Sequence, residues 1–411
     1  MRKQSRIRRT RGDVCFLRGE IHGALDHYLS SAAFYKPFDE QEMVALLEEL
    51  AGTIYEAGRM SIEPHFFVAA ELIEAALAVK HVSESPRRKA EFSFRLGLIY
   101  RNAGVASSSA EKAQYVDKAI LHTRAALTGL NQPKDHFTLI SAKIGLGNCL
   151  IDKAKIENDL DTLQSAILLF EDVKQEIEQS GKSTELLGHA YNNLAGALME
   201  IHLIAQTEVT DQTLDEVLIA YQAAIRVSEA NNDIANWGAA KANYGYRLAH
   251  KARLESTKEK EAVFLRIQSI SAFLAALETY PSTLFPRQYA ETHIGLADVL
   301  VQQGQNSNEN LIELHFFRAL GSYSGACEIY FTKDRHPIRW AELQKKLGNI
   351  FAIHAQLEGT ESTHSDLEQS IEHIENARRI FRQHNISAEI EACDRALKTL
   401  SELVEEPSDA E

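Results

Sequence analysis

Bulky, small and polar residues recur in one order in four segments of this chain: Leu187–Leu198, Trp237–Leu248, Tyr289–Leu300 and Trp340–Phe351. In each segment a bulky residue lies eight positions before a small one, and Leu or Phe follows three positions later. Across the chain the small position recurs at steps of 50, 48, 50, 52 and 51 residues, at Gly97, Gly147, Ala195, Gly245, Ala297 and Gly348. A fixed period of this length predicts an array of helical repeats.

A second apolar pattern lies downstream of each small position. It places a small residue, a larger one four positions later and another small one three positions beyond that. Steps of four and three keep all three residues on one face of a helix. The sets are Ala69, Ile73, Ala76; Ala119, Thr123, Ala126; Ala166, Phe170, Val173; Val217, Tyr221, Ala224; Ser269, Phe273, Ala276; Ala319, Tyr323, Ala326; and Ser370, Ile374, Ala377.

The recurring glycine indicates that the two helices of each repeat lie very close together. Glycine inside a helix costs about 1 kcal/mol relative to alanine, so its return at a fixed period needs a compensating reason. We expect the second helix to approach the first so closely that no larger side chain fits between them. Each repeat is therefore predicted to be a helical hairpin, joined through small residues around one larger residue.

These patterns give a division of the chain. Residues 1–38 are predicted to form a basic N-terminus and one short helical pair, and residues 39–385 to form seven long hairpins. Residues 386–403 are predicted to be a capping helix, and 404–411 an acidic disordered tail. First helices are expected near 39–59, 87–103, 135–155, 184–204, 234–253, 286–303 and 337–356. Second helices are expected near 62–81, 110–130, 159–180, 210–231, 259–280, 308–331 and 364–384.

The short N-terminal pair resembles the 34-residue tetratricopeptide repeat. Its residues Gly12, Cys15, Gly19, Ala24, Tyr28 and Ser31 stand at spacings of 3, 4, 5, 4 and 3. The longer units, with segments such as "WAELQKKLGN", resemble the long-period tetratricopeptide arrays found in many bacterial proteins. The resemblance covers about residues 5–385. It implies an all-α, right-handed superhelical solenoid of antiparallel helix pairs, which we expect to form one elongated body.

Composition narrows the classes of function. A hydrophobic content of 45% with 25% charged residues is ordinary for a soluble chain, and a net charge of −14 disfavours nucleic acid and anionic membrane surfaces. The four cysteines form no CxxC pair, which favours reduced thiols in a cytoplasmic protein. No run approaches 18 apolar residues and no secretory signal begins the chain, so we expect no membrane-spanning helix.

Motifs for catalysis or cofactor binding are weak. The segment Ser180–Thr184, "SGKST", lacks the earlier glycine and the preceding strand of a phosphate loop, so we interpret it as a glycine helix stop followed by a capping Ser or Thr. The 16 histidines show no metal-ligand spacing. We therefore expect a protein that is not an enzyme and has no metal or cofactor. A site assembled across repeats stays open, as does phosphate binding by the N-terminal basic residues Arg2, Lys3, Arg6, Arg8, Arg9 and Arg11.

The resemblance implies that the first helices line a concave groove that binds a partner peptide or helix. The positions that face this groove in tetratricopeptide arrays are Arg101, Asn102, Asn148, Asp152, His189, Asn192, Glu200, Tyr246, His250, Glu291, Asp298, Gln302, Glu342 and Asn349. Asparagine both donates and accepts hydrogen bonds, so it can hold an extended backbone. The acidic candidates would give the groove a mainly acidic character: Asp152, Glu200, Glu291, Asp298 and Glu342. A groove of this kind predicts a basic or amphipathic partner segment.

The sequence thus predicts a scaffold or adaptor for protein–protein interaction. Two alternatives stay open: a regulatory sensor whose superhelical pitch responds to a peptide or ligand, and an enzyme or nucleic-acid-binding protein. The identity of the partner and the oligomeric state cannot be predicted from these patterns.

Overall fold

The computed structural model describes residues 2–37, 39–59, 65–107, 109–130, 135–254, 257–306, 309–356 and 363–405. All regular secondary structure in these ranges is helical, so the fold is all-α as predicted. The chain divides into two compact units, Met1–Ala240 and Lys241–Glu411, and each is described by itself. The single elongated body and its right-handed superhelix stay predictions.

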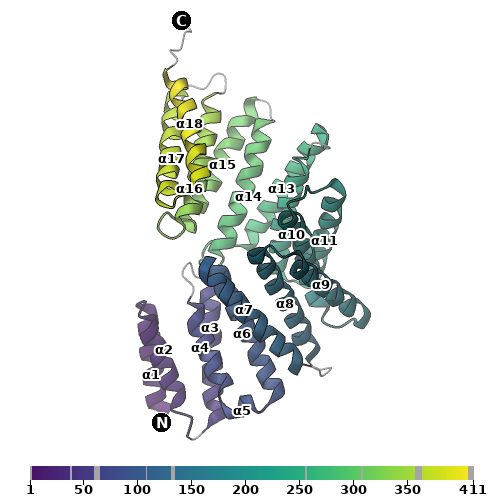
Figure 1. Cartoon of the computed structure of the whole chain (residues 1–411), viewed down its shortest axis with the longest axis vertical. Helices are drawn as coiled ribbons and strands as arrows, with labels where there is room; N and C mark the ends of the chain where they lie inside the picture. The colour runs from purple at the N-terminus through teal and green to yellow at the C-terminus, as the bar shows by residue number, and fades with distance from the viewer. Residues whose placement is uncertain are drawn as a thin grey trace. The chain divides into compact units, whose positions relative to one another are not determined.

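The first unit begins with the short pair α1 and α2, and then alternates first helices (α3, α6, α8, α10) with second helices (α4, α7, α9, α11), as Figure 1 shows. Consecutive helices pack against each other within each hairpin. The bounds are α1 Arg2–Leu17, α2 Ile21–Ala33, α3 Glu40–Arg59, α4 Phe66–Leu77, α5 Lys80–Ser83, α6 Pro86–Ala106, α7 Ser109–Gly129, α8 His136–Glu157, α9 Leu160–Ser180, η2 Thr184–Leu186, α10 Leu187–Ala205 and α11 Asp211–Ala230.

The second unit continues the alternation, and α12 carries the boundary between the units. First helices are α12, α14 and α16, second helices are α13, α15 and α17, and α18 packs on α17. The bounds are α12 Ile234–Lys251, α13 Glu259–Thr279, α14 Pro286–Gln305, α15 Glu309–Ile329, α16 Pro337–His354, α17 Thr363–Gln383 and α18 Ser387–Glu405.

Most helix ends lie within two residues of the expected positions, but several differ by more: the helix expected over 87–103 continues to Ala106, and the one expected from residue 62 begins at Phe66, with 62–64 outside the described residues. The helix expected over 62–81 ends at Leu77, and the separate turn α5 follows it. The helix expected from residue 184 begins at Leu187, after the short 3₁₀ helix η2. The last helix continues to Glu405, so only residues 406–411 of the expected acidic tail lie outside the described residues.

Close approach within the hairpin is confirmed where the recurring small residue is glycine. A Cβ atom placed on Gly147 would lie 2.5 Å from the ring of Phe170, and one on Gly348 would lie 2.7 Å from Cγ1 of Ile374. Real Cβ atoms essentially never come within 3.0 Å of such neighbours. The larger residue of each second helix, which we call the wedge residue, therefore occupies the space that a first-helix side chain would need.

The small residues beside the wedge are completely buried. Ala119, Ala166, Val217 and Ala319 each have 0% exposure. In two hairpins of the second unit this small residue is serine, and its hydroxyl donates to the carbonyl of the facing glycine: Ser269 to Gly245 at 2.7 Å, and Ser370 to Gly348 at 2.8 Å. A buried hydroxyl costs stability unless it is hydrogen-bonded, so these bonds explain why serine is accepted there.

The wedge residue also joins neighbouring hairpins. A Cβ on Gly245 would lie 3.2 Å from the Phe273 ring, and one on Gly295, in the next first helix, would lie 2.7 Å from the same ring. Phe273 has 0% exposure. It therefore fills the space between two first helices, which explains a second glycine two positions before the recurring small residue.

Helix α13 is long and apolar enough to span a membrane by length and composition, and 39% of its most apolar window is buried. One such helix is weak evidence, because core helices of soluble proteins pass the same test. Ala262, Ser269 and Phe273 are buried in the hairpin with α12 and α14. Its apolar content thus has a role in packing.

All four cysteines are free thiols. Cys149, Cys327 and Cys393 are buried, and Cys15 is partly buried. Burial raises the pKa of Cys149 to about 12 and that of Cys327 to about 11. The thiolate is the reactive form of cysteine, so these two side chains act as packing groups.

Candidate functional site

Polar contacts between the expected groove residues link neighbouring first helices of the first unit. Arg101 Nε of α6 lies 2.9 Å from Asp152 Oδ2 of α8. Lys155 Nζ of α8 lies 2.7 Å from Glu200 Oε1 of α10. These pairs place Arg101, Asp152 and Glu200 on one face that crosses consecutive hairpins.

A hydrogen bond extends this face to α3. The Asn102 amide of α6 donates to the Tyr55 hydroxyl of α3 at 2.7 Å, and also to its own helix at the carbonyl of Leu98, at 3.1 Å. Burial raises the pKa of Tyr55. Helix α3 was absent from the expected groove set, so the face begins one hairpin earlier than the sequence indicated.

The three other expected residues of this unit are half-buried and lie on α8 and α10. His189 Nε2 lies 2.7 Å from Asp233 Oδ2, in the turn before α12. The Asn192 amide donates to Asn193 Oδ1 over a long 3.5 Å. Asn148 is also half-buried, midway along α8.

In the second unit the Tyr246 hydroxyl of α12 donates to the carbonyl of Glu291 in α14 at 2.6 Å. Burial raises the pKa of Tyr246, so the hydroxyl remains protonated and can donate. The Glu291 carboxylate lies 2.9 Å from Arg287 Nε, one turn earlier on α14. This contact again joins consecutive first helices.

His250 and Glu342 lie on the same first helices. Burial lowers the pKa of His250, and Arg253 and Arg247 lower it further because they are nearby cations. Glu342 Oε2 lies 2.5 Å from Arg339 Nη1 within α16. His250 is therefore a neutral group near neutral pH, and Glu342 is a paired carboxylate.

The last three expected residues, Asp298, Gln302 and Asn349, lie together around one hollow of about 320 Å³. Helices α14 and α16 supply most of its wall, with one residue from α15 and one from the turn after α12. Its lining is Arg253, Asp298, Val301, Gln302, Gln305, Tyr323, Lys346, Asn349, Ile350 and Ile353.

The hollow combines an organised polar group with an unpaired one. Lys346 and the Tyr323 hydroxyl both contact Oδ1 of Asp298, and Lys346 Nζ lies 5.4 Å from the centre of the Tyr323 ring. Burial and the Asp298 charge raise the pKa of Tyr323, so its hydroxyl donates. By contrast, Oε1 of Gln302 is buried and accepts no hydrogen bond from the described residues. A buried acceptor without a donor costs about 1–3 kcal/mol, and a bound N–H group would remove that cost.

The face is mixed in charge, whereas the sequence predicted a mainly acidic one. Each of the five acidic candidates has a basic partner, in the pairs Asp152–Arg101, Glu200–Lys155, Glu291–Arg287, Asp298–Lys346 and Glu342–Arg339. Four of these basic partners, all except Arg101, were not among the expected groove residues. Counting only the acidic residues in the expected set therefore overestimated the negative charge of this face.

A second hollow of about 180 Å³ lies where α3, α4 and α6 meet, and the sequence did not predict it. Gly52, Tyr55, Ile73 and Leu98 contribute to its lining. A Cβ on Gly52 would meet no atom within 4 Å, so this glycine leaves the wall of the hollow open. Gly52, inside α3, was the one feature of the sequence that could have indicated this hollow.

The N-terminal basic residues are partly engaged within the first unit. Arg9 Nη2 lies 2.8 Å from Glu49 Oε1 of α3, and Arg8 donates to the carbonyl of Ser30 at 3.4 Å. Arg6 and Arg9 line a hollow of about 280 Å³ beside Glu42 and Glu49. These carboxylates reduce the local positive charge, which weakens the case for a phosphate site.

The "SGKST" segment is a helix stop, but its serine does not cap the next helix. Gly181 has φ +63° and its N–H bonds to the carbonyl of Ile177 at 2.9 Å, which ends α9 in the left-handed conformation. Ser183, one of the two residues expected as a cap, has φ 55° and makes no side-chain cap bond, and the residue that precedes α10 is Leu186. Its hydroxyl instead lies 2.9 Å from Nδ1 of His136, at the start of α8.

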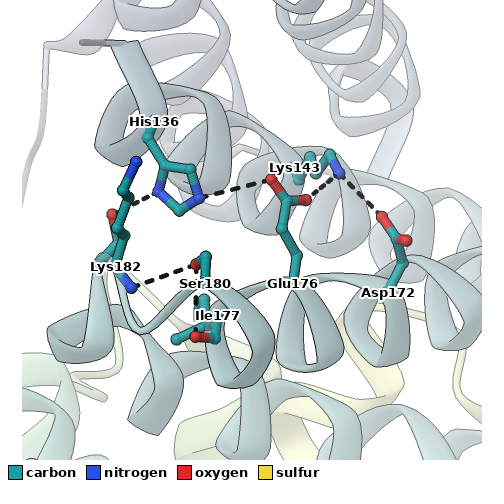
Figure 2. Close-up of polar contacts among 8 residues, drawn as sticks. His136, Lys143, Asp172, Glu176, Ile177, Ser180 and Lys182 are labelled. Atoms are coloured by element: carbon teal, nitrogen blue, oxygen red, sulfur yellow. Dashed lines mark hydrogen bonds and ion pairs between the residues drawn. The ribbon is translucent and has the colours of Figure 1, made fainter. Parts of the chain in front are cut away.

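A polar cluster surrounds this contact, as Figure 2 shows. Glu176 of α9 lies between two basic groups of α8: His136 Nε2 at 3.6 Å and Lys143 Nζ at 2.6 Å. Lys143 also lies 2.9 Å from Asp172. The cluster links the start of α8 to the last turns of α9, so it stabilises the hairpin.

Among the residues that the structure describes, no group of three or more His, Cys, Asp or Glu side chains could hold a metal ion. The repeated hairpin, with its wedge residue against recurring small residues, decides the type of fold. The chain is a tetratricopeptide-like array of helical hairpins. No family model and no curated protein matches the sequence of this array.

Solved structures with a similar fold include BtubC from P. vanneervenii, at 14% identity, over 68% of this chain and 93% of that chain, with a TM-score of 0.41. A Rap protein complexed with competence and sporulation factor matches at 10% identity, over 98% of this chain and 99% of that chain, with a TM-score of 0.45. The TPR2AB domain of yeast Sti1 in complex with pHSP90 matches at 14% identity, over 76% and 98%, with a TM-score of 0.24. At these scores the similarities say nothing about partners.

Proposed function

We propose that the protein is an adaptor that binds a peptide or helical segment of another protein along the face of its first helices. The observation that carries this proposal is the hollow around Asp298, Gln302 and Asn349. It combines apolar walls, exposed amides and a buried carbonyl oxygen that accepts no hydrogen bond from the residues that the structure describes. Binding sites typically join an apolar surface to a few placed polar groups.

The chemistry of the hollow favours an amphipathic segment. Val301 and Ile353, both partly exposed, offer apolar contacts to one side chain of the partner. Gln302 can accept from a backbone N–H of the partner, and the exposed Asn349 can both donate and accept. Because the acidic residues are paired, a partner with mixed charge fits this face better than a strongly basic one.

A purely basic partner segment, the other expectation from the sequence, has less support, because each acidic candidate already has a cation partner, as Glu200 has in Lys155. We also propose a cytoplasmic location, because four free thiols are typical of a reducing compartment.

Selection of random displayed peptides on the immobilised full chain tests the proposal. Selected peptides are expected to bind wild type and to lose at least about tenfold in affinity on the double variant Gln302→Ala and Asn349→Ala, the equivalent of about 1.4 kcal/mol. The matched control is Gln164→Ala with Gln369→Ala, which removes two exposed amides from the second helices α9 and α17.

Equal affinity for wild type and for both double variants would place binding away from this hollow and refute the proposal. Loss of binding in the control alone would move the site to the second helices. Circular dichroism of each variant checks that the fold is retained.

A further inference from the structure

One face of α15 is largely exposed; on it Phe317 makes an edge contact with the His354 ring of α16, with ring centroids 5.8 Å apart. The residues of this face are spaced by three and four positions and so lie along one side of the helix. The side chains of Leu314 and Phe317 are 51% and 61% exposed. The α15 face, as we call it, comprises Leu314, Phe317, Arg318, Gly321, Gly325 and Glu328.

The two glycines of this face differ from the recurring glycines of the hairpins. A Cβ atom on Gly321 or on Gly325 would meet nothing within 4 Å, whereas one on Gly348 would collide with α17. Each glycine inside a helix costs about 1 kcal/mol relative to alanine. No contact with the described residues compensates for that cost at these two positions, but the close approach of a helix from outside would.

The residues on this face are symmetrically spaced, and the two ends of the face carry opposite charges. Arg318 precedes Gly321 by three positions, Gly325 follows after four, and Glu328 comes three later. If a second α15 lies antiparallel, with the centre of symmetry at position 323, each Gly321 faces Gly325 of the other copy. Each Arg318 then lies beside Glu328 of the other copy. An unrelated partner would not require this symmetry.

The charges of this face are available for such pairing. Arg318 and Glu328 are both exposed, and neither forms an ion pair with the part of the chain that the structure describes. Phe317 would face the last turn of the other copy's α15, which adds apolar contact at each end. We propose that two copies of this chain associate through antiparallel α15 helices, crossing at Gly321 and Gly325 and held by reciprocal Arg318–Glu328 pairs.

Sedimentation equilibrium of the full chain with charge-reversal variants tests this interface. Wild type is expected to form a dimer. The single variants Arg318→Glu and Glu328→Arg each place like charges together twice, and should weaken the dimer by about tenfold or more. The double variant Arg318→Glu, Glu328→Arg should restore the dimer. A mixture of the two single variants should form a heterodimer, because all its charge pairs become opposite.

The variant Gly325→Leu separates dimer loss from misfolding. Because space around Gly325 is open in one copy, leucine there should preserve or raise the melting temperature while it blocks the close crossing. The proposal is wrong if wild type is monomeric at all concentrations, or if either single reversal dimerises as wild type does. It is also wrong if the double variant stays monomeric, or if Gly325→Leu leaves the dimer intact.

Discussion

The substitution Gly147→Ala isolates the close approach between α8 and α9. The added Cβ would lie 2.5 and 2.6 Å from two ring atoms of Phe170, a side chain with 0% exposure. Because that ring is enclosed on all sides, it can move only if α8 and α9 separate. The substitution should therefore destabilise the first unit although alanine favours helix formation.

A matched control gives the magnitude. Gly196→Ala introduces the same methyl group into α10, where its nearest neighbour would be the Tyr221 hydroxyl at 3.7 Å, an ordinary contact. There the gain in helix propensity should prevail and stabilise the protein by up to about 1 kcal/mol. Both substitutions gain the same helix propensity. The difference between their changes in the free energy of unfolding therefore measures the cost of overpacking, which is typically about 1–3 kcal/mol.

Urea unfolding followed by circular dichroism compares the two variants, and hydrogen exchange locates the change. Gly147→Ala should have a lower midpoint than wild type, with faster exchange in α8 and α9, while Gly196→Ala should have an equal or higher midpoint. If Gly147→Ala unfolds at or above the wild-type midpoint, steric exclusion does not explain the recurring glycine.

Three further predictions follow from buried or paired groups. Cys149 and Cys327, with pKa values raised to about 12 and 11, should resist iodoacetamide at pH 8 in the folded protein and react fully in denaturant, as read by mass spectrometry. Arg266 is 4% exposed and bonds Gln303 at 2.9 Å, so Arg266→Ala should cost about 1–3 kcal/mol in a urea titration; a loss below about 0.5 kcal/mol would show that the bond is unimportant. A double-mutant cycle on Lys155 and Glu200 should give only about 0.2–1 kcal/mol of coupling, because Lys155 is 46% exposed.

Periodicity predicted the helices because it depends on local geometry. The steps of four and three placed Phe170, Phe273 and Ile374 against the small positions, where the structure has them. Gly295 was missed as a packing residue because its contact is with Phe273 of the preceding hairpin. Such contacts depend on how repeats stack, and a pattern within one repeat does not contain that information.

The candidate site was predictable in position and less so in chemistry. Resemblance placed Asp298, Gln302 and Asn349 on one face, and the structure brings them around one hollow. The charge of the face was wrong because Lys346, two positions before the recurring glycine, turns toward Asp298. The hollow beside Gly52 was missed because α3 has alanine and glycine, Ala51 and Gly52, near the small position and gives no clear register.

The most direct test of the adaptor proposal is site-specific photo-crosslinking of a selected peptide. A photoreactive residue replaces Gln305 of the first helix α14, which lines the hollow and is unchanged in the affinity test, or, in a second sample, Gln369 on the second helix α17; both positions are exposed. Crosslinks that form from position 305, are competed by unlabelled peptide and are absent from position 369 are the result expected for binding at the face of the first helices. Crosslinks from position 369 alone would contradict it.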